Sequence, residues 1–111
     1  MPCLFCQIVD KEVPSEIIYE DDKVLGFRDI NPEAPVHILF VPKKHIEWKD
    51  DLVREKDNLW PVVLAAKKVA QEKNIFEACK LVFNLGETGE IPHIHLHLLG
   101  GWDKNVPKKV I

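Results

Sequence analysis

Short apolar segments divided by polar turns mark most of this chain, and their spacing predicts strands. Residues 17–20 and 24–27 flank an acidic turn at 21–23, and this arrangement predicts a β-hairpin. Residues 36–41 are almost wholly apolar, which is typical of a central strand covered on both faces.

Two further strands are expected over residues 80–84 and 93–99. Between the third and fourth strands, apolar residues recur at helical spacing: Leu59, Val62, Val63, Ala66, Val69 and Ala70. Asn58 is the predicted N-cap, so Pro61 would lie in the first turn, where its missing N–H costs little. The order of elements predicts an α+β fold, an antiparallel sheet with one long helix on one face.

The length, charge and apolar content of the chain exclude several classes of protein. The 111 residues fit one domain, and a net charge of −3 provides no basic field for a nucleic-acid backbone. The apolar runs are too short for a membrane span, and Cys3 and Cys6 stand where a signal peptide would be apolar. We therefore expect a soluble cytoplasmic protein that binds neither nucleic acid nor membrane.

The strongest chemical signal is the alternation of His93, His95 and His97 with aliphatic residues. Alternate residues of a strand share a face, about 6.6 Å apart at roughly 3.3 Å per residue. Neighbouring imidazoles at this spacing can reach different atoms of one phosphate, as nucleophile or as hydrogen-bond donor. A polar strand face without a function and a bare metal site are the alternatives.

His37 interrupts the apolar run of the predicted central strand. A single histidine in a strand is usually a core residue with its hydrogen bonds satisfied. Beside the His-x-His-x-His segment in the same sheet, a functional role is equally reasonable.

Cys3 and Cys6 form a C-x-x-C pair, and Cys79 stands alone in an apolar stretch. In a reducing compartment such a pair more often binds metal or does redox chemistry than forms a structural disulfide. No thioredoxin-like βαβ pattern surrounds the pair, which argues against redox chemistry. We favour a structural zinc site in which two cysteine thiolates and two imidazoles bind the metal. Cys79 is expected to be a buried small apolar residue.

The sequence resembles the histidine-triad (HIT) superfamily, and most closely its Hint branch. The resemblance rests on segments that occur in family order: residues 17–22, 27–32, 34–37 and 41–46, Asn84, and the His-x-His-x-His segment. It implies an α+β domain with a five-stranded sheet that pairs with a second copy into a homodimer with one continuous sheet. The tail, residues 102–111, differs from the usual Hint tail.

The resemblance also implies hydrolysis of purine nucleoside phosphoramidates through a covalent nucleotidyl-histidine. His95 would be the nucleophile, oriented by the main-chain carbonyl of His93, while His97 and His37 contact the phosphate. Asp29 would bind the ribose hydroxyls and Asn84 would lie near the phosphate. The apolar base pocket implied by the resemblance comprises Phe5, Ile8, Val13, Phe27, Ile30 and Leu39.

Family members with an N-terminal C-x-x-C bind zinc, and the resemblance maps the four ligands onto Cys3, Cys6, His45 and His93. Four protein ligands leave no open position for water, so this zinc would be structural. The segment at 86–92 departs from the family by being shorter, with Glu90 the nearest candidate for its missing polar side chains.

Two other functions remain open at this point. One is a dinucleoside polyphosphate hydrolase or nucleotidyltransferase of a sister branch. The other is a zinc-stabilised nucleotide-binding scaffold with little catalysis.

Overall fold

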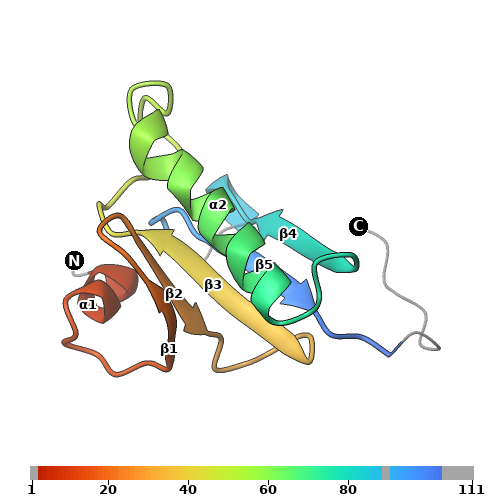
Figure 1. Ribbon diagram of the computed structural model, residues 1–111. Helices are drawn as coiled ribbons and strands as arrows, with labels where there is room; N and C mark the ends of the chain where they lie inside the picture. The colour runs from red at the N-terminus through yellow and green to blue at the C-terminus, as the bar shows by residue number, and fades with distance from the viewer. Residues whose placement is uncertain (1–2, 89–90, 104–111) are drawn as a thin grey trace.

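A five-stranded antiparallel sheet forms the centre of the computed structural model, which describes residues 3–88 and 91–103 (Figure 1). The strand order is β1-β2-β3-β5-β4. The strands are β1 (Ile17–Glu20), β2 (Val24–Arg28), β3 (Val36–Pro42), β4 (Cys79–Phe83) and β5 (Leu96–Gly100). The predicted α+β class and the five-stranded sheet are confirmed.

The predicted hairpin and central strand are both present. Asp21 closes the turn between β1 and β2, since its Oδ1 accepts hydrogen bonds from the main-chain N–H groups of Lys23 and Val24, both at 2.8 Å. The third strand, β3, pairs with β2 on one side and β5 on the other. This central position explains why nearly every residue of β3 is apolar and buried.

Helix α2 (Lys56–Glu72) crosses one face of the sheet and packs against β2, β3 and β5 (Figure 1). Its buried positions Val62, Ala66 and Val69 meet Phe40 and Leu98 from the sheet in the main apolar core. This 17-residue helix is the longest in the described part of the chain, where no helix is long and apolar enough to span a bilayer.

The predicted start of the helix was wrong. Helix α2 begins at Lys56, ahead of the expected N-cap Asn58, so Pro61 lies inside the helix rather than in its first turn. A proline there leaves the carbonyl four residues earlier without its usual partner. The Nζ of Lys23 donates to that carbonyl, on Asp57, at 3.0 Å, and this tertiary contact accommodates the proline.

The opposite face of the sheet carries the short helix α1 (Leu4–Val9). Phe5 and Ile8 of α1 pack against Leu25, Phe27 and Leu39 in a second apolar cluster. Because α1 has only six residues, it covers only part of this face, and side chains on the α1 side of the sheet can be reached from solvent.

The last strand begins three residues later than predicted, at Leu96 rather than His93. Pro42, at the end of β3, has no N–H with which to continue the ladder. The chain before β5 pairs instead with residues 46–47, through an isolated bridge between Glu47 and His93 and a 2.8 Å bond from the Ile94 N–H to the Ile46 carbonyl. His93 and His95 therefore lie in an extended segment beside the main ladder.

Two smaller differences concern β4. It runs from Cys79 to Phe83, one residue earlier than expected. Cys79 is only partly buried, with its Sγ 3.8 Å from the Phe76 carbonyl oxygen.

We predict that Gly26 and Phe40 are energetically coupled. A Cβ on Gly26 would lie 2.7 Å from Cε1 of Phe40, so Gly26→Ala should destabilise the fold by about 1–3 kcal/mol. In a Phe40→Leu background this clash is removed, and the added cost of Gly26→Ala should fall by at least half. Urea unfolding of the four proteins measures the coupling, and strictly additive losses would contradict it.

Candidate active site and metal centre

His95 has the geometry of a nucleophile. It is 7% exposed, and its Nδ1–H donates to the main-chain carbonyl of His93 at 2.9 Å. With the proton on Nδ1, the lone pair is on Nε2. The Phe5 ring packs against the imidazole in a T-shaped arrangement, with ring centroids 4.9 Å apart, and restricts its rotation.

A chain of hydrogen bonds fixes the tautomer of His97. The main-chain N–H of Glu33 donates to Nδ1 of His37 at 3.0 Å, so this nitrogen is an acceptor. A neutral His37 then carries its proton on Nε2 and donates to Nδ1 of His97 at 2.8 Å. The proton of His97 must consequently lie on Nε2, where it can be donated to a ligand.

His97 is neutral at physiological pH. Burial, with smaller contributions from nearby His95 and His37, lowers the pKa of His97 to about 4. Its ability to donate therefore comes from its tautomer, not from a positive charge. The ring centroids of His95 and His97 lie 5.1 Å apart, so both rings can contact one phosphate group.

Of the other polar residues assigned to the substrate, Asp29 lies beside His37 and Asn84 beside His97. The Oδ2 of Asp29 is 3.3 Å from Nε2 of His37, and its Oδ1 accepts from the Asn31 N–H at 2.8 Å. The side-chain amide of Asn84 lies 3.3 Å from Nε2 of His97. Because that nitrogen carries a proton, a half-turn of the amide would present Oδ1 as its acceptor.

Five of the six residues expected in an apolar pocket lie together on this face. Phe5, Ile8, Phe27 and Leu39 belong to the buried cluster, and Val13 packs against it. Ile30 lies apart, 89% exposed, on the loop after β2. Glu90, the nearest candidate for the polar side chains missing from the segment at 86–92, lies outside the described residues.

A second polar group gathers Cys3, Cys6, His45 and His93, whose ligand atoms all lie within 4.8 Å of one another. Cys6 Sγ is 3.2 Å from Nδ1 of His45 and 3.6 Å from Nδ1 of His93, and Cys3 Sγ is 3.5 Å from the latter. Two sulfurs and two ring nitrogens converging in this way match the donor set of tetrahedral zinc.

The protonation of this group also fits a metal. Burial is the main cause that lowers the pKa of His93 to about 4, and its Nε2–H donates to the Pro42 carbonyl at 2.8 Å. Nδ1 of His93 is thereby left as a lone pair facing the cysteines. Burial and the neighbouring Cys3 raise the pKa of Cys6 to about 11, so its thiolate needs a cation to form at neutral pH.

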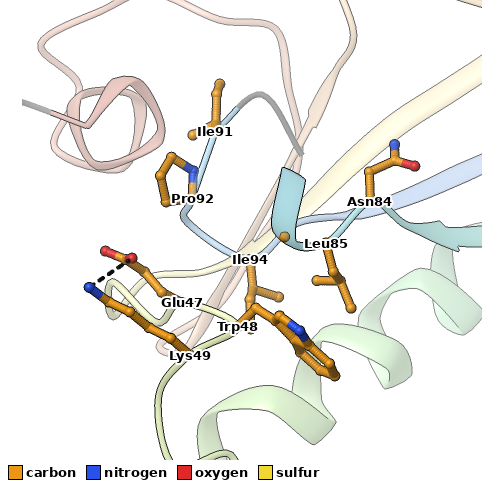
Figure 2. A pocket seen from close by; sticks show the side chains of 9 residues that line it. Glu47, Trp48, Lys49, Asn84, Leu85, Ile91, Pro92 and Ile94 are labelled. Atoms are coloured by element: carbon orange, nitrogen blue, oxygen red, sulfur yellow. Dashed lines mark ion pairs between the residues drawn. The ribbon is translucent and has the colours of Figure 1, made fainter. Parts of the chain in front are cut away.

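A hollow is lined by Glu47, which contacts His45, and by Asn84, which contacts His97 (Figure 2). Glu47, Trp48 and Lys49 lie along one side of it, and Asn84 lies across from them. The remaining lining residues are Leu85, Gly86, Ile91, Pro92 and Ile94.

Sequence reasoning missed three groups that orient the histidines. The Glu33 N–H and the Pro42 carbonyl are main-chain atoms, for which side-chain identity gives no signal. The third is Glu47, whose carboxylate lies 2.8 Å from Nε2 of His45. Its spacing could have revealed it, because residues two apart in an extended segment share a side.

Comparison with known proteins agrees with this geometry. Residues 2–108 match the family model described as "Scavenger mRNA decapping enzyme C-term binding". The 14 kDa zinc-binding protein of Zea mays is 43% identical over 115 residues, covering 96% of this chain and 87% of its own. The purine nucleoside phosphoramidase of Escherichia coli K12 is 41% identical over 102 residues, covering 88% of this chain and 86% of its own.

Solved structures show the same fold. A HIT family hydrolase from Legionella pneumophila superposes with a TM-score of 0.87 at 43% identity, covering 96% of this chain and 98% of its own. A histidine triad protein from Clostridium difficile gives 0.88 at 39% identity, covering 99% of this chain and 97% of its own. Because similarity in sequence and in fold extends over nearly the whole chain, this protein belongs to the histidine-triad (HIT) family of hydrolases.

Proposed function

We propose that this protein hydrolyses purine nucleoside phosphoramidates at the α-phosphorus through a nucleotidyl intermediate on His95. The observation that carries the proposal is the hydrogen bond from Nδ1 of His95 to the His93 carbonyl, which leaves Nε2 as the nucleophile. The similarity to the purine nucleoside phosphoramidase of Escherichia coli supports the choice of substrate class.

The reaction would take two steps. In the first, the Nε2 lone pair of His95 bonds to phosphorus, the bond from phosphorus to the amine breaks, and the amine leaves with a proton from solvent. In the second, water bonds to phosphorus, the bond to Nε2 breaks and its electron pair returns to His95. The water protons pass to the nucleotide product and to solvent. His97 would donate its Nε2–H to a phosphate oxygen in both steps.

For His37 we propose a role other than the phosphate contact that the resemblance implies. Both of its ring nitrogens are engaged, one with the Glu33 N–H and the other with His97, and the side chain is 3% exposed. It would act through His97, as a positioning residue. Asp29 would accept from the ribose hydroxyls, and the apolar cluster around Phe5 and Phe27 would hold the base.

We predict that His95→Ala lowers phosphoramidate turnover by at least about 10³-fold, because no other group replaces the nucleophile. The assay compares an adenosine phosphoramidate, a diadenosine polyphosphate and a nucleotide sugar. The first should be turned over fastest by the wild-type protein. Cys79→Ser, whose side chain packs against the apolar core on the α2 side of the sheet, is the matched control and should keep full activity.

The other two functions give different results in the same assay. Faster turnover of the diadenosine polyphosphate or of the nucleotide sugar would favour a sister-branch hydrolase or nucleotidyltransferase. AMP binding without turnover of any of the three would favour a nucleotide-binding scaffold.

The cysteine and histidine group supports a structural zinc site at Cys3, Cys6, His45 and His93. When bound, zinc would stabilise the two thiolates and join the N-terminal segment to the segment that carries His95. The zinc-binding protein of Zea mays supports this choice of metal.

We predict that the purified wild-type protein contains about one equivalent of zinc, because four converging donors form a closed site. Cys3→Ser and Cys6→Ser should each lose most of the metal and several degrees of melting temperature, whereas Cys79→Ser should lose neither. Elemental analysis measures the zinc content, and thermal unfolding measures the melting temperature. Less than about half an equivalent in the wild type would count against the site.

A homodimer formed through β4 is also part of the proposal. This edge strand pairs Leu81 with Leu98 and Phe83 with Leu96, so both side chains face the helix side of the sheet. Yet Leu81 and Phe83 are 44% and 42% exposed, because α2 lies over β2, β3 and β5. Trp60 of α2, 61% exposed, lines the same apolar hollow as Phe83.

A second copy would bury this surface. Two antiparallel β4 edges would extend the sheet, and the partner's α2 would cover the exposed apolar side chains. We predict that Leu81→Asp converts a dimer to a monomer in analytical ultracentrifugation. Ile17→Asp, at the opposite edge strand and 37% exposed, is the matched control and should stay dimeric. A monomeric wild type would refute the interface.

A further inference from the structure

Glu47 makes a contact with the proposed metal group that none of the four ligand assignments includes. Its Oε2 lies 2.8 Å from Nε2 of His45. On the other side of the same ring, Nδ1 lies 3.2 Å from Cys6 Sγ. The imidazole of His45 is therefore held between a carboxylate and a thiol.

A carboxylate can only accept a hydrogen bond, so Nε2 of His45 must be the nitrogen that carries the proton. Nδ1 is then a lone pair directed toward Cys6. This is the tautomer that a metal ligand needs, and an outer acceptor of this kind fixes ring orientation and increases ligand basicity.

The main chain places Glu47 for this contact. Residues 45 and 47 share a side of the extended segment, while Ile46 between them points into the core with 0% exposure. The bridge between Glu47 and His93 fixes the segment against the second histidine of the group. The N–H of Glu47 also donates to Oδ2 of Asp50 at 2.8 Å, which anchors its backbone.

The two histidines of the group are oriented in different ways. Nε2 of His93 donates to the Pro42 carbonyl, a main-chain atom that no substitution removes. Nε2 of His45 relies on a side chain, and His45 is also the more exposed of the two. Of the two groups that accept a hydrogen bond from Nε2 of these histidines, only the Glu47 carboxylate can therefore be removed by substitution.

We propose that Glu47 is a positioning residue for zinc, fixing His45 in the tautomer that presents Nδ1 to the metal. This inference rests on the zinc site proposed above. Lys49 does not account for the geometry, since its Nζ is 3.7 Å from the other oxygen of Glu47 and its side chain is 80% exposed (Figure 2).

The test is the affinity of the full-length protein for Zn²⁺, measured at fixed pH by competition with a chromophoric chelator. Glu47→Ala should weaken binding about 10-fold, the low end for an outer acceptor, because water can partly replace the carboxylate at this position, where the Glu47 side chain is 28% exposed. Glu47→Gln keeps an accepting oxygen without the charge and should lose less. Lys49→Ala, the matched control, should bind as the wild type does.

Circular dichroism of each metal-loaded variant checks the fold, and Glu47→Gln keeps the test decisive if Glu47→Ala does not fold. Equal affinities for the wild type and the folded Glu47 variants would overturn the role of Glu47 alone. An equal loss in Lys49→Ala would overturn it too, by assigning the effect to the surface ion pair. A wild type that binds no Zn²⁺ would overturn the zinc site itself.

Discussion

Hydrogen bonds between main-chain groups and imidazole rings decide what His93, His95 and His37 can do. The Pro42 carbonyl accepts from His93, the His93 carbonyl accepts from His95, and the Glu33 N–H donates to His37. Each of these bonds places one proton, and the other ring nitrogen takes the opposite role. The site thus combines a lone pair at His95 with a donor at His97.

This scheme depends on where the sheet ladder stops. If β5 continued regularly past Leu96, the carbonyls of its early residues would be committed to strand pairing. Pro42 ends that pairing because it has no N–H, and the chain at His93 and Ile94 turns to residues 46–47 instead. The His93 carbonyl is then available to the ring of His95, and the Pro42 carbonyl to the ring of His93.

The sequence allowed the sheet, the helix and the chemistry-bearing histidines to be predicted, because hydrophobic period and residue type are local signals. What it could not provide were features set by contacts between distant segments. Pro61 lies inside helix α2, and the Asp57 carbonyl that it leaves without a helical partner accepts from Lys23, 34 positions earlier in the chain. The start of β5 depends on Pro42 in another strand. Ile30, which the family resemblance assigns to the base pocket, is 89% exposed on the loop after β2, and its contact with a base stays a prediction.

The proposed zinc would stabilise a part of the chain that the sheet holds less firmly. The segment with His93 and His95 lies beside the main ladder, so fewer strand hydrogen bonds hold it than hold β5. Cys3 and His93 are 90 positions apart, and joining them through a metal would close a long loop in the chain. His93 would then bind the metal through its ring and orient the nucleophile His95 through its main-chain carbonyl. Motion of His93 would disturb both groups at once, so whatever restrains its ring also keeps the nucleophile of His95 aligned.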